Sequence, residues 1–153
     1  MIIGARTGNF LMTTKIIVID DDTAVTDLLS VLLKSHGFDV RATNNSSEGL
    51  NLIRDDKFDL VILDLMMPEM DGWEICKEVR AFSQVPIIVL SALNDPSMVA
   101  SVLDAGADDY LTKPTPSRIL VAHINRLTRR GTTTPLSAAS SVLTRPARPL
   151  TAT

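Results

Sequence analysis

Four short apolar runs of this sequence each end in side chains capable of chemistry. These side chains are Asp20 with Asp21, then Asp64, Ser91 and Lys113. Carboxylates are ligands for divalent cations and nucleophiles toward phosphorus, and an ammonium group stabilises phosphoryl oxygens. The residue types therefore favour transfer of a phosphoryl group onto a carboxylate, provided that the fold brings them together.

The elements that must position these residues alternate between strand and helix periodicity. Strands are predicted over 15–19, 38–42, 60–63, 85–90 and 110–112, and helices over 24–36, 46–56 and 116–130, with further helices that begin at Asp71 and Asp95. Five strands and five helices in alternation predict an α/β, doubly wound parallel sheet that is covered on both faces. The site of such a sheet lies beyond the carboxyl ends of the strands.

Helical spacing of apolar residues also predicts which side chains are buried. Leu28 belongs to the stripe of the first helix, Phe82 to that of the third and Leu103 to that of the fourth, so all three are expected to face inward. Asp22 and Asp71 are expected to cap helices and not to take part in chemistry, because aspartate is common at helix starts.

The acids after the first and third strands are predicted to share one pocket. Neighbouring parallel strands lie about 5 Å apart, so Asp20, Asp21 and Asp64 should crowd together. Three adjacent carboxylates repel one another and cannot all stay ionised alone. Hard oxygen ligands suit Mg²⁺, which keeps positions for a phosphate. We therefore predict a Mg²⁺ site in which an oxygen of Asp64 attacks phosphorus, assisted by Lys113 and Ser91.

Four segments in chain order resemble the receiver domain of two-component response regulators. They are KIIVIDDD, VILDLMMPEMDGWE, VLSAL and AGADDYLTKP, and the resemblance covers residues 15–130. It implies a flavodoxin-like fold with strand order 2-1-3-4-5. It also implies a phosphorelay signalling domain, and not an enzyme in the metabolic sense, which takes its phosphoryl group from a sensor histidine kinase.

The resemblance assigns roles to the residues of the acidic pocket. Asp64 is implied to be the phosphoryl acceptor, while Asp20 and Asp21 hold Mg²⁺ together with Asp64 and the backbone carbonyl of Met66. The Met66 side chain stands where a polar residue can help water to attack the acyl phosphate. Because a thioether cannot do so, we expect slow self-dephosphorylation.

The resemblance further implies a switch. Lys113 contacts the phosphoryl group, and its peptide bond to Pro114 is expected to be cis. Ser91 moves toward the new charge, and Tyr110 turns inward to fill the space that Ser91 leaves. This changes the face formed by the fourth helix, the fifth strand and the fifth helix, which we expect to contact a downstream protein or a second copy of the chain.

One departure from the family concerns that face. Winged-helix response regulators often dimerise there through charged pairs, but this chain has Val99, Ser101, Ile119 and His123 at positions where charged residues are common. We therefore do not expect the usual charge-paired dimer. His123 has no partner that the sequence reveals and is expected to lie on the surface.

The two ends differ in composition from the middle. We expect an extension over 1–12, the receiver domain over 13–130 and a flexible tail over 131–153, with translation starting at Met1 or Met12. The first segment lacks the apolar core of a secretory signal, and the last is rich in Thr, Ser, Ala and Pro. We interpret the chain as a stand-alone receiver; the alternative is the truncated receiver half of a winged-helix, DNA-binding transcriptional regulator.

Composition and motifs count against other classes of protein. With 153 residues, 45% hydrophobic content and a net charge of −3, the chain is one folded domain on which direct nucleic-acid binding is not expected. No apolar run approaches the roughly 20 residues of a membrane span, and the single Cys76 indicates a reducing, cytoplasmic compartment. An aspartyl phosphatase needs an acid two residues after its nucleophile, where this chain has Met66. A flavin-binding domain needs small residues after the first strand, where this chain has three acids. A dinucleotide binder needs the motif Gly-x-Gly-x-x-Gly, which the sequence lacks.

Overall fold

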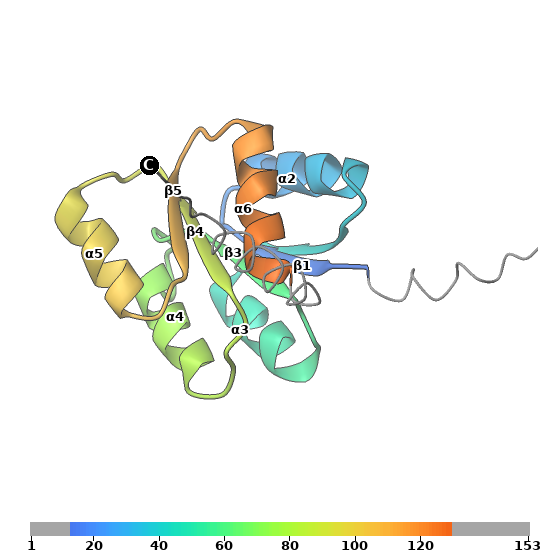
Figure 1. The fold of residues 1–153 in the computed structure, drawn as a ribbon. Coiled ribbons are helices and arrows are strands. Elements are labelled where there is room, and N and C mark those ends of the chain that lie inside the picture. Colours follow the sequence, from blue (N-terminus) through green and yellow to red (C-terminus); the bar gives the residue numbers. More distant parts are fainter. Residues whose placement is uncertain (1–12, 130–153) are drawn as a thin grey trace, which may run out of the picture.

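The computed structural model describes residues 13–129 (Figure 1). The extension predicted over 1–12, the last residue of the predicted domain at 130 and the tail predicted over 131–153 lie outside the described residues. The elements are β1 (Lys15–Ile19), α2 (Thr23–Ser35), β2 (Asp39–Thr43), α3 (Ser46–Asp55), β3 (Leu60–Leu63), α4 (Gly72–Arg80), β4 (Ile87–Ser91), α5 (Pro96–Asp104), β5 (Asp109–Thr112) and α6 (Ser117–Thr128). None of the helices within 13–129 combines the length and the apolar character that crossing a lipid bilayer requires.

The strands form one parallel sheet in the order β2-β1-β3-β4-β5. Ile19 at the end of β1 pairs with Leu63 at the end of β3, so the residues that follow these two strands lie side by side. Ser91 at the end of β4 pairs in the same way with Thr112 at the end of β5. The α/β fold class and the strand order 2-1-3-4-5 are thereby confirmed.

Helices cover both faces of the sheet, with α2 and α6 on one face and α3, α4 and α5 on the other (Figure 1). Successive residues of β1 alternate between the two cores: Ile17 packs on the face of α3, α4 and α5, and Val18 packs on the face of α2 and α6. Every residue of β3 is buried, as its unbroken apolar run predicts for a strand covered on both faces.

Two helices that follow the acidic strand ends begin with an aspartate cap. Asp22 accepts a hydrogen bond from the backbone N–H of Ala24 at 2.9 Å, and Asp71 accepts one from that of Glu74 at 3.0 Å. Each bond satisfies a backbone donor that has no partner inside the helix. Both predicted caps are confirmed.

Three of the predicted inward side chains are instead exposed. Leu28 is 65% exposed, and Phe82 and Leu103 are each 41% exposed. Leu28 lies at the edge of the apolar stripe of α2, where neither the sheet nor α6 covers it. Phe82 follows the end of α4, and its ring lies 5.0 Å from the guanidinium carbon of Arg54. Periodicity gives the direction of a side chain, but not whether another element covers it.

Candidate functional site

Three carboxylates meet beyond the carboxyl ends of β1 and β3. One carboxylate oxygen from each residue can be chosen so that those of Asp20, Asp21 and Asp64 all lie within 4.8 Å of one another. Asp20 is 3% exposed and Asp64 is 8% exposed, while Asp21 is open to solvent. The structure thus brings together the three acids that the sequence predicts to share a pocket, and the pairing of β1 with β3 is the cause.

Lys113 reaches the two buried acids from the end of β5. Its Nζ lies 2.8 Å from Oδ2 of Asp20 and 3.5 Å from Oδ1 of Asp64. Its backbone N–H donates to the carbonyl of Ser91 at 2.8 Å, and its peptide bond to Pro114 is cis. The ammonium group therefore balances part of the negative charge, and it lies closer to Asp20 than to Asp64.

Burial and repulsion make an ionised Asp64 costly. Loss of hydration on burial raises the pKa of Asp64, and the negative charge of Asp20 raises it further; the ammonium of Lys113 opposes both effects without cancelling them. Burial lowers the pKa of Lys113, but the hydrogen bond to Asp20 and the charges of both acids outweigh burial and raise that pKa overall. Lys113 therefore stays charged, while the negative charge of the Asp64 carboxylate is only partly balanced.

This donor set fits a hard divalent cation. Three carboxylate oxygens lie within one small volume, and Mg²⁺ binds through one or two carboxylates while it retains waters. Added positive charge would also offset the repulsion that raises the pKa of Asp64. Met66, whose backbone carbonyl is the further expected ligand, lies in the loop between β3 and α4, and its side chain is 57% exposed.

The start of α4 packs directly on the backbone at Asp64. The N–H of Gly72 donates to the carbonyl of Leu65 at 2.9 Å. A Cβ at position 72 would lie 2.8 Å from both the carbonyl oxygen of Asp64 and the Cα of Leu65, which is too close for any residue except glycine. Gly72 therefore lets α4 support the loop that presents Asp64 and Met66.

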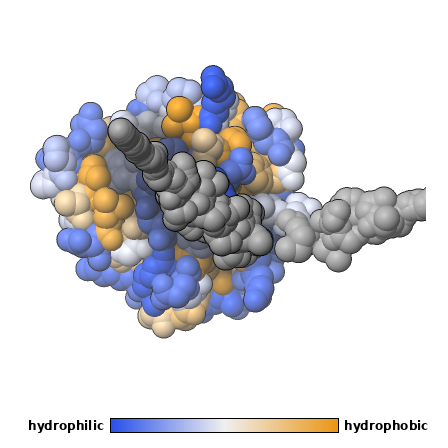
Figure 2. Space-filling model, viewed as in Figure 1, coloured by the Kyte–Doolittle hydropathy of each residue, from blue (hydrophilic) through white to orange (hydrophobic). Residues whose placement is uncertain are grey.

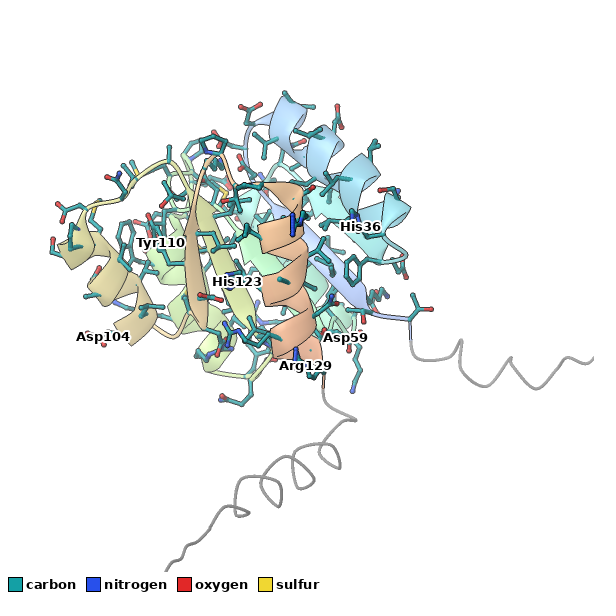
Figure 3. All side chains as sticks on the ribbon, turned by 45° about the horizontal axis from the view of Figure 1, so that its top comes forward. His36, Asp59, Asp104, Tyr110, His123 and Arg129 are labelled. Atoms are coloured by element: carbon teal, nitrogen blue, oxygen red, sulfur yellow. The ribbon has the colours of Figure 1, made fainter. Side chains whose placement is uncertain are left out.

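Ser91 and Tyr110 both bind the same loop residue. Ser91 is 1% exposed, and its Oγ accepts a hydrogen bond from the N–H of Leu93 at 3.3 Å. The hydroxyl of Tyr110, on β5 (Figure 3), donates to the carbonyl of Leu93. The Tyr110 ring packs against the core beneath α3, α4 and α5, so this structure already holds it inward. Leu93 therefore connects the hydroxyl at the end of β4 to the ring on β5.

Asn44 is a member of the site that the sequence argument did not identify. It follows β2, and its Nδ2 donates to the carbonyl of Asp20 at 2.8 Å and to Oγ1 of Thr26 at 2.9 Å. These bonds fix the backbone beneath the acidic cluster to α2. The signal was present in the sequence, because a polar residue at the end of a strand is the same feature that identified the acids.

The structure supplies a partner for His123 that the sequence did not reveal. Its Nδ1 lies 2.5 Å from Oδ2 of Asp109, and Nη2 of Arg126 lies 2.6 Å from the same oxygen. The His123 side chain, on α6 (Figure 3), is only 29% exposed. Residues three apart on a helix share one face, so His123 and Arg126 both meet the acid of β5. The packing of α6 beside β5 creates this contact between residues that are 14 positions apart in the sequence.

Comparison with known proteins places most of the described residues in one family. A family model described as "Response regulator receiver domain" matches residues 16–125. The transcriptional regulatory protein AfsQ1 of Streptomyces coelicolor is 40% identical over 116 residues, which are 76% of this chain and 52% of that protein. The DNA-binding response regulator MtrA of Mycolicibacterium smegmatis is 40% identical over 119 residues, 78% of this chain and 52% of that protein. The chain spans about half the length of these curated relatives.

Solved structures agree with this match. A two-component response regulator from Clostridium difficile has a TM-score of 0.74 and 32% identity, and the similarity covers 77% of this chain and 98% of that one. The BeF3-activated DrrB receiver domain has a TM-score of 0.71 and 34% identity, over 78% of this chain and 100% of that one. Fold and sequence therefore point to the same family.

Asp64→Asn is expected to stabilise the metal-free protein near neutral pH. Below 3.8, the ordinary pKa of aspartic acid, Asp64 is protonated in both the folded and unfolded states, so it contributes nothing to stability. Above the raised pKa of the folded state, the buried charge is fully destabilising. Asn should therefore raise the free energy of unfolding by about 1 kcal/mol at neutral pH, and the gain should vanish as the pH approaches 3.8.

Urea unfolding followed by the fluorescence of Trp73, the single tryptophan, measures this difference. Asp27→Asn, at an exposed acid within α2, is the matched control and should show no such gain. Mg²⁺ should stabilise the wild type more than Asp64→Asn, because the variant lacks a ligand. A variant that is less stable than the wild type at neutral pH in excess chelator would contradict the electrostatic argument.

Proposed function

Because this chain belongs to the family of response regulator receiver domains, we propose that it accepts a phosphoryl group on Asp64 from the phosphohistidine of a sensor histidine kinase. The observation that carries the proposal is the meeting of Asp20, Asp21, Asp64 and Lys113 at the carboxyl end of the sheet. Receiver domains work with histidine kinases and typically bind Mg²⁺. The chain is thus a signalling domain that takes part in its own phosphorylation.

Each residue of the cluster has a distinct task in this transfer. An oxygen of Asp64 attacks phosphorus in line, a P–O bond forms, and the bond from phosphorus to the histidine nitrogen breaks. The ammonium of Lys113 pairs with a phosphoryl oxygen. Asp20, Asp21, Asp64 and the backbone carbonyl of Met66 hold Mg²⁺, which when bound supplies positive charge to the phosphoryl oxygens.

The resting geometry favours Asp64 as the nucleophile over Asp20. Nζ of Lys113 lies 2.8 Å from Oδ2 of Asp20 but 3.5 Å from Oδ1 of Asp64, so its hydrogen bond to Asp64 is the weaker one. The oxygens of Asp64 are therefore the more nucleophilic toward phosphorus. Asp20 also accepts the backbone N–H of Asp22 at 2.9 Å. These bonds make Asp20 a positioned ligand and leave Asp64 the less restrained carboxylate.

Signal output is proposed to begin at Ser91. A phosphoryl group on Asp64 adds negative charge and strong acceptors, toward which the Ser91 hydroxyl turns. The N–H of Leu93 then loses its acceptor, and the loop that also binds Tyr110 through the Leu93 carbonyl is released. The change passes to the face of α5, β5 and α6. At the left of Figure 2, where α5 lies in the view of Figure 1, hydrophobic surface is interspersed with hydrophilic surface.

We propose that the face of α5, β5 and α6 binds a downstream protein or a second copy of the chain, and that this chain acts as a stand-alone receiver without direct contact to nucleic acid. The relatives favour a specific alternative. They are named as DNA-binding or transcriptional regulators, and this chain spans about half of their length. In that alternative, the chain corresponds to the receiver half of a DNA-binding regulator.

Asp64→Asn should abolish uptake of a phosphoryl group from acetyl phosphate, because the amide is not a nucleophile toward phosphorus. Excess chelator should suppress uptake by the wild type to a similar degree. Intact-mass spectrometry of the protein counts the added group, and Asp55→Asn serves as the control that retains normal uptake. Labelling of Asp64→Asn at the wild-type rate would show that another residue is the acceptor.

Beryllofluoride, which mimics a phosphoryl group on a carboxylate, should shift the amide NMR resonances of Leu93, Tyr110 and the first turns of α6. Ser91→Ala removes the acceptor of the Leu93 N–H, so in this variant the same addition should leave the resonance of Tyr110 nearly unchanged. Ser35→Ala, at the end of α2, is the control that should respond as the wild type does. Equal shifts in Ser91→Ala and the wild type would exclude the path through Ser91.

A gel-shift assay tests the proposal that this chain does not contact nucleic acid directly. The phosphorylated chain is expected to give no sequence-specific retardation of DNA, because its net charge of −3 gives it little attraction for DNA phosphates. A scrambled-sequence duplex and a titration of salt control for non-specific binding to phosphates. Specific retardation that requires phosphorylation would overturn the proposal that the chain acts without direct contact to nucleic acid.

A further inference from the structure

A groove beside the acidic cluster is lined mainly by methionine and tryptophan. Met66, Met67, Met98 and Trp73 contribute to its wall, and Asp21 connects it to the acidic cluster. Its volume is about 630 Å³. We propose that Met66 is a site of reversible oxidation by peroxide, and that its sulfoxide accelerates loss of the phosphoryl group from Asp64. The effect on the phosphoryl group rests on the proposed function.

Exposure distinguishes Met66 from the methionines near it. The side chain of Met66 is 57% exposed, while that of Met67 is 7% exposed and that of Met98 is half-buried. A thioether needs no deprotonation before oxidation, so access of the oxidant sets the relative rates. Peroxide approaching the groove therefore reaches Met66 more readily than Met67 or Met98.

The oxidation is balanced by the peroxide alone. A lone pair of the Met66 sulfur attacks one oxygen of hydrogen peroxide, the O–O bond breaks and an S–O bond forms. The other oxygen leaves as water after it takes up the proton that the transferred oxygen releases. Sulfur is oxidised by two electrons and the peroxide is reduced. Methionine sulfoxide reductases return the thioether, one class of enzyme for each sulfoxide epimer.

The resemblance to receiver domains puts the Met66 side chain where a polar group can help water to attack the acyl phosphate, and the sulfoxide would supply such a group. The sulfur of methionine occupies the same position along the side chain as Cδ of glutamine, so the sulfoxide oxygen of Met66 corresponds to a glutamine Oε1. Met66 shares the groove with Asp21, whose carboxylate has an oxygen within 4.8 Å of one of Asp64. An acceptor there can hold a water for attack on phosphorus, which the thioether cannot do.

Brief treatment of the whole chain with hydrogen peroxide tests the inference in two steps. Fragment-ion mass spectrometry is needed to assign oxidation, because Met66 and Met67 are adjacent; Met66 should be oxidised well before Met67 and Met98. The protein is then labelled with acetyl phosphate and Mg²⁺, the acetyl phosphate is removed by desalting into buffer that keeps Mg²⁺, and the decay of the label is followed. Decay should be about five-fold faster after oxidation, which corresponds to about 1 kcal/mol from one added hydrogen bond.

Three variants assign the effect to Met66. Met66→Gln should decay without peroxide at a rate close to that of oxidised wild type. Met66→Leu should have the same decay rate before and after peroxide, whatever that rate is. Met98→Leu should respond to peroxide as the wild type does. Treatment with sulfoxide reductases of both epimer specificities should restore slow decay in the wild type.

The outcomes separate this inference from the proposed function. Earlier oxidation of Met67 or Met98, an unchanged decay after oxidation of Met66, or a response that persists in Met66→Leu would each overturn the inference and leave the proposed function intact. Failure of the untreated wild type to take up label at all would overturn the proposed function, and the effect on the phosphoryl group would fall with it.

Discussion

Repulsion between carboxylates that are withdrawn from water is the interaction on which the rest of this structure depends. Burial and the charge of Asp20 both raise the pKa of Asp64, so the cluster survives only with nearby positive charge. Lys113 supplies part of it from β5, two strands away from β3. The cluster therefore exists only when β1, β3 and β5 are all in place, which ties the chemistry of the site to formation of the whole sheet.

Local signals in the sequence predicted much of this scaffold because they report short-range physical effects. The unbroken apolar run Leu60–Leu63 predicted a strand buried on both faces, and Asp71 was recognised as a cap because helix starts lack internal acceptors for their N–H groups. The acids were expected to meet because parallel strands end at one edge of the sheet. The order of the strands came from the resemblance to receiver domains, since periodicity carries no information about which strands pair.

Contacts that depend on tertiary packing were not predictable in this way. The partner of His123 is Asp109, an acid of β5 that only the docking of α6 brings near. Leu28 has the periodicity of a core residue, yet it is 65% exposed because nothing covers that edge of α2. The bonds of Leu93 to Ser91 and Tyr110 use its backbone N–H and carbonyl, which every non-proline residue has, so no residue type could reveal them.

The ion pairs of Asp109 bear on how the face of α5, β5 and α6 could bind a partner. Oδ2 of Asp109 already lies 2.5 Å from His123 and 2.6 Å from Arg126 of its own chain. A cation from a partner would have to replace one of these bonds, so the net gain in free energy would be small. Ile119 is 45% exposed and Leu103 is 41% exposed, and their burial would be favourable without such an exchange. Contact on this face should therefore draw its affinity from apolar burial, with charge contributing mainly to orientation.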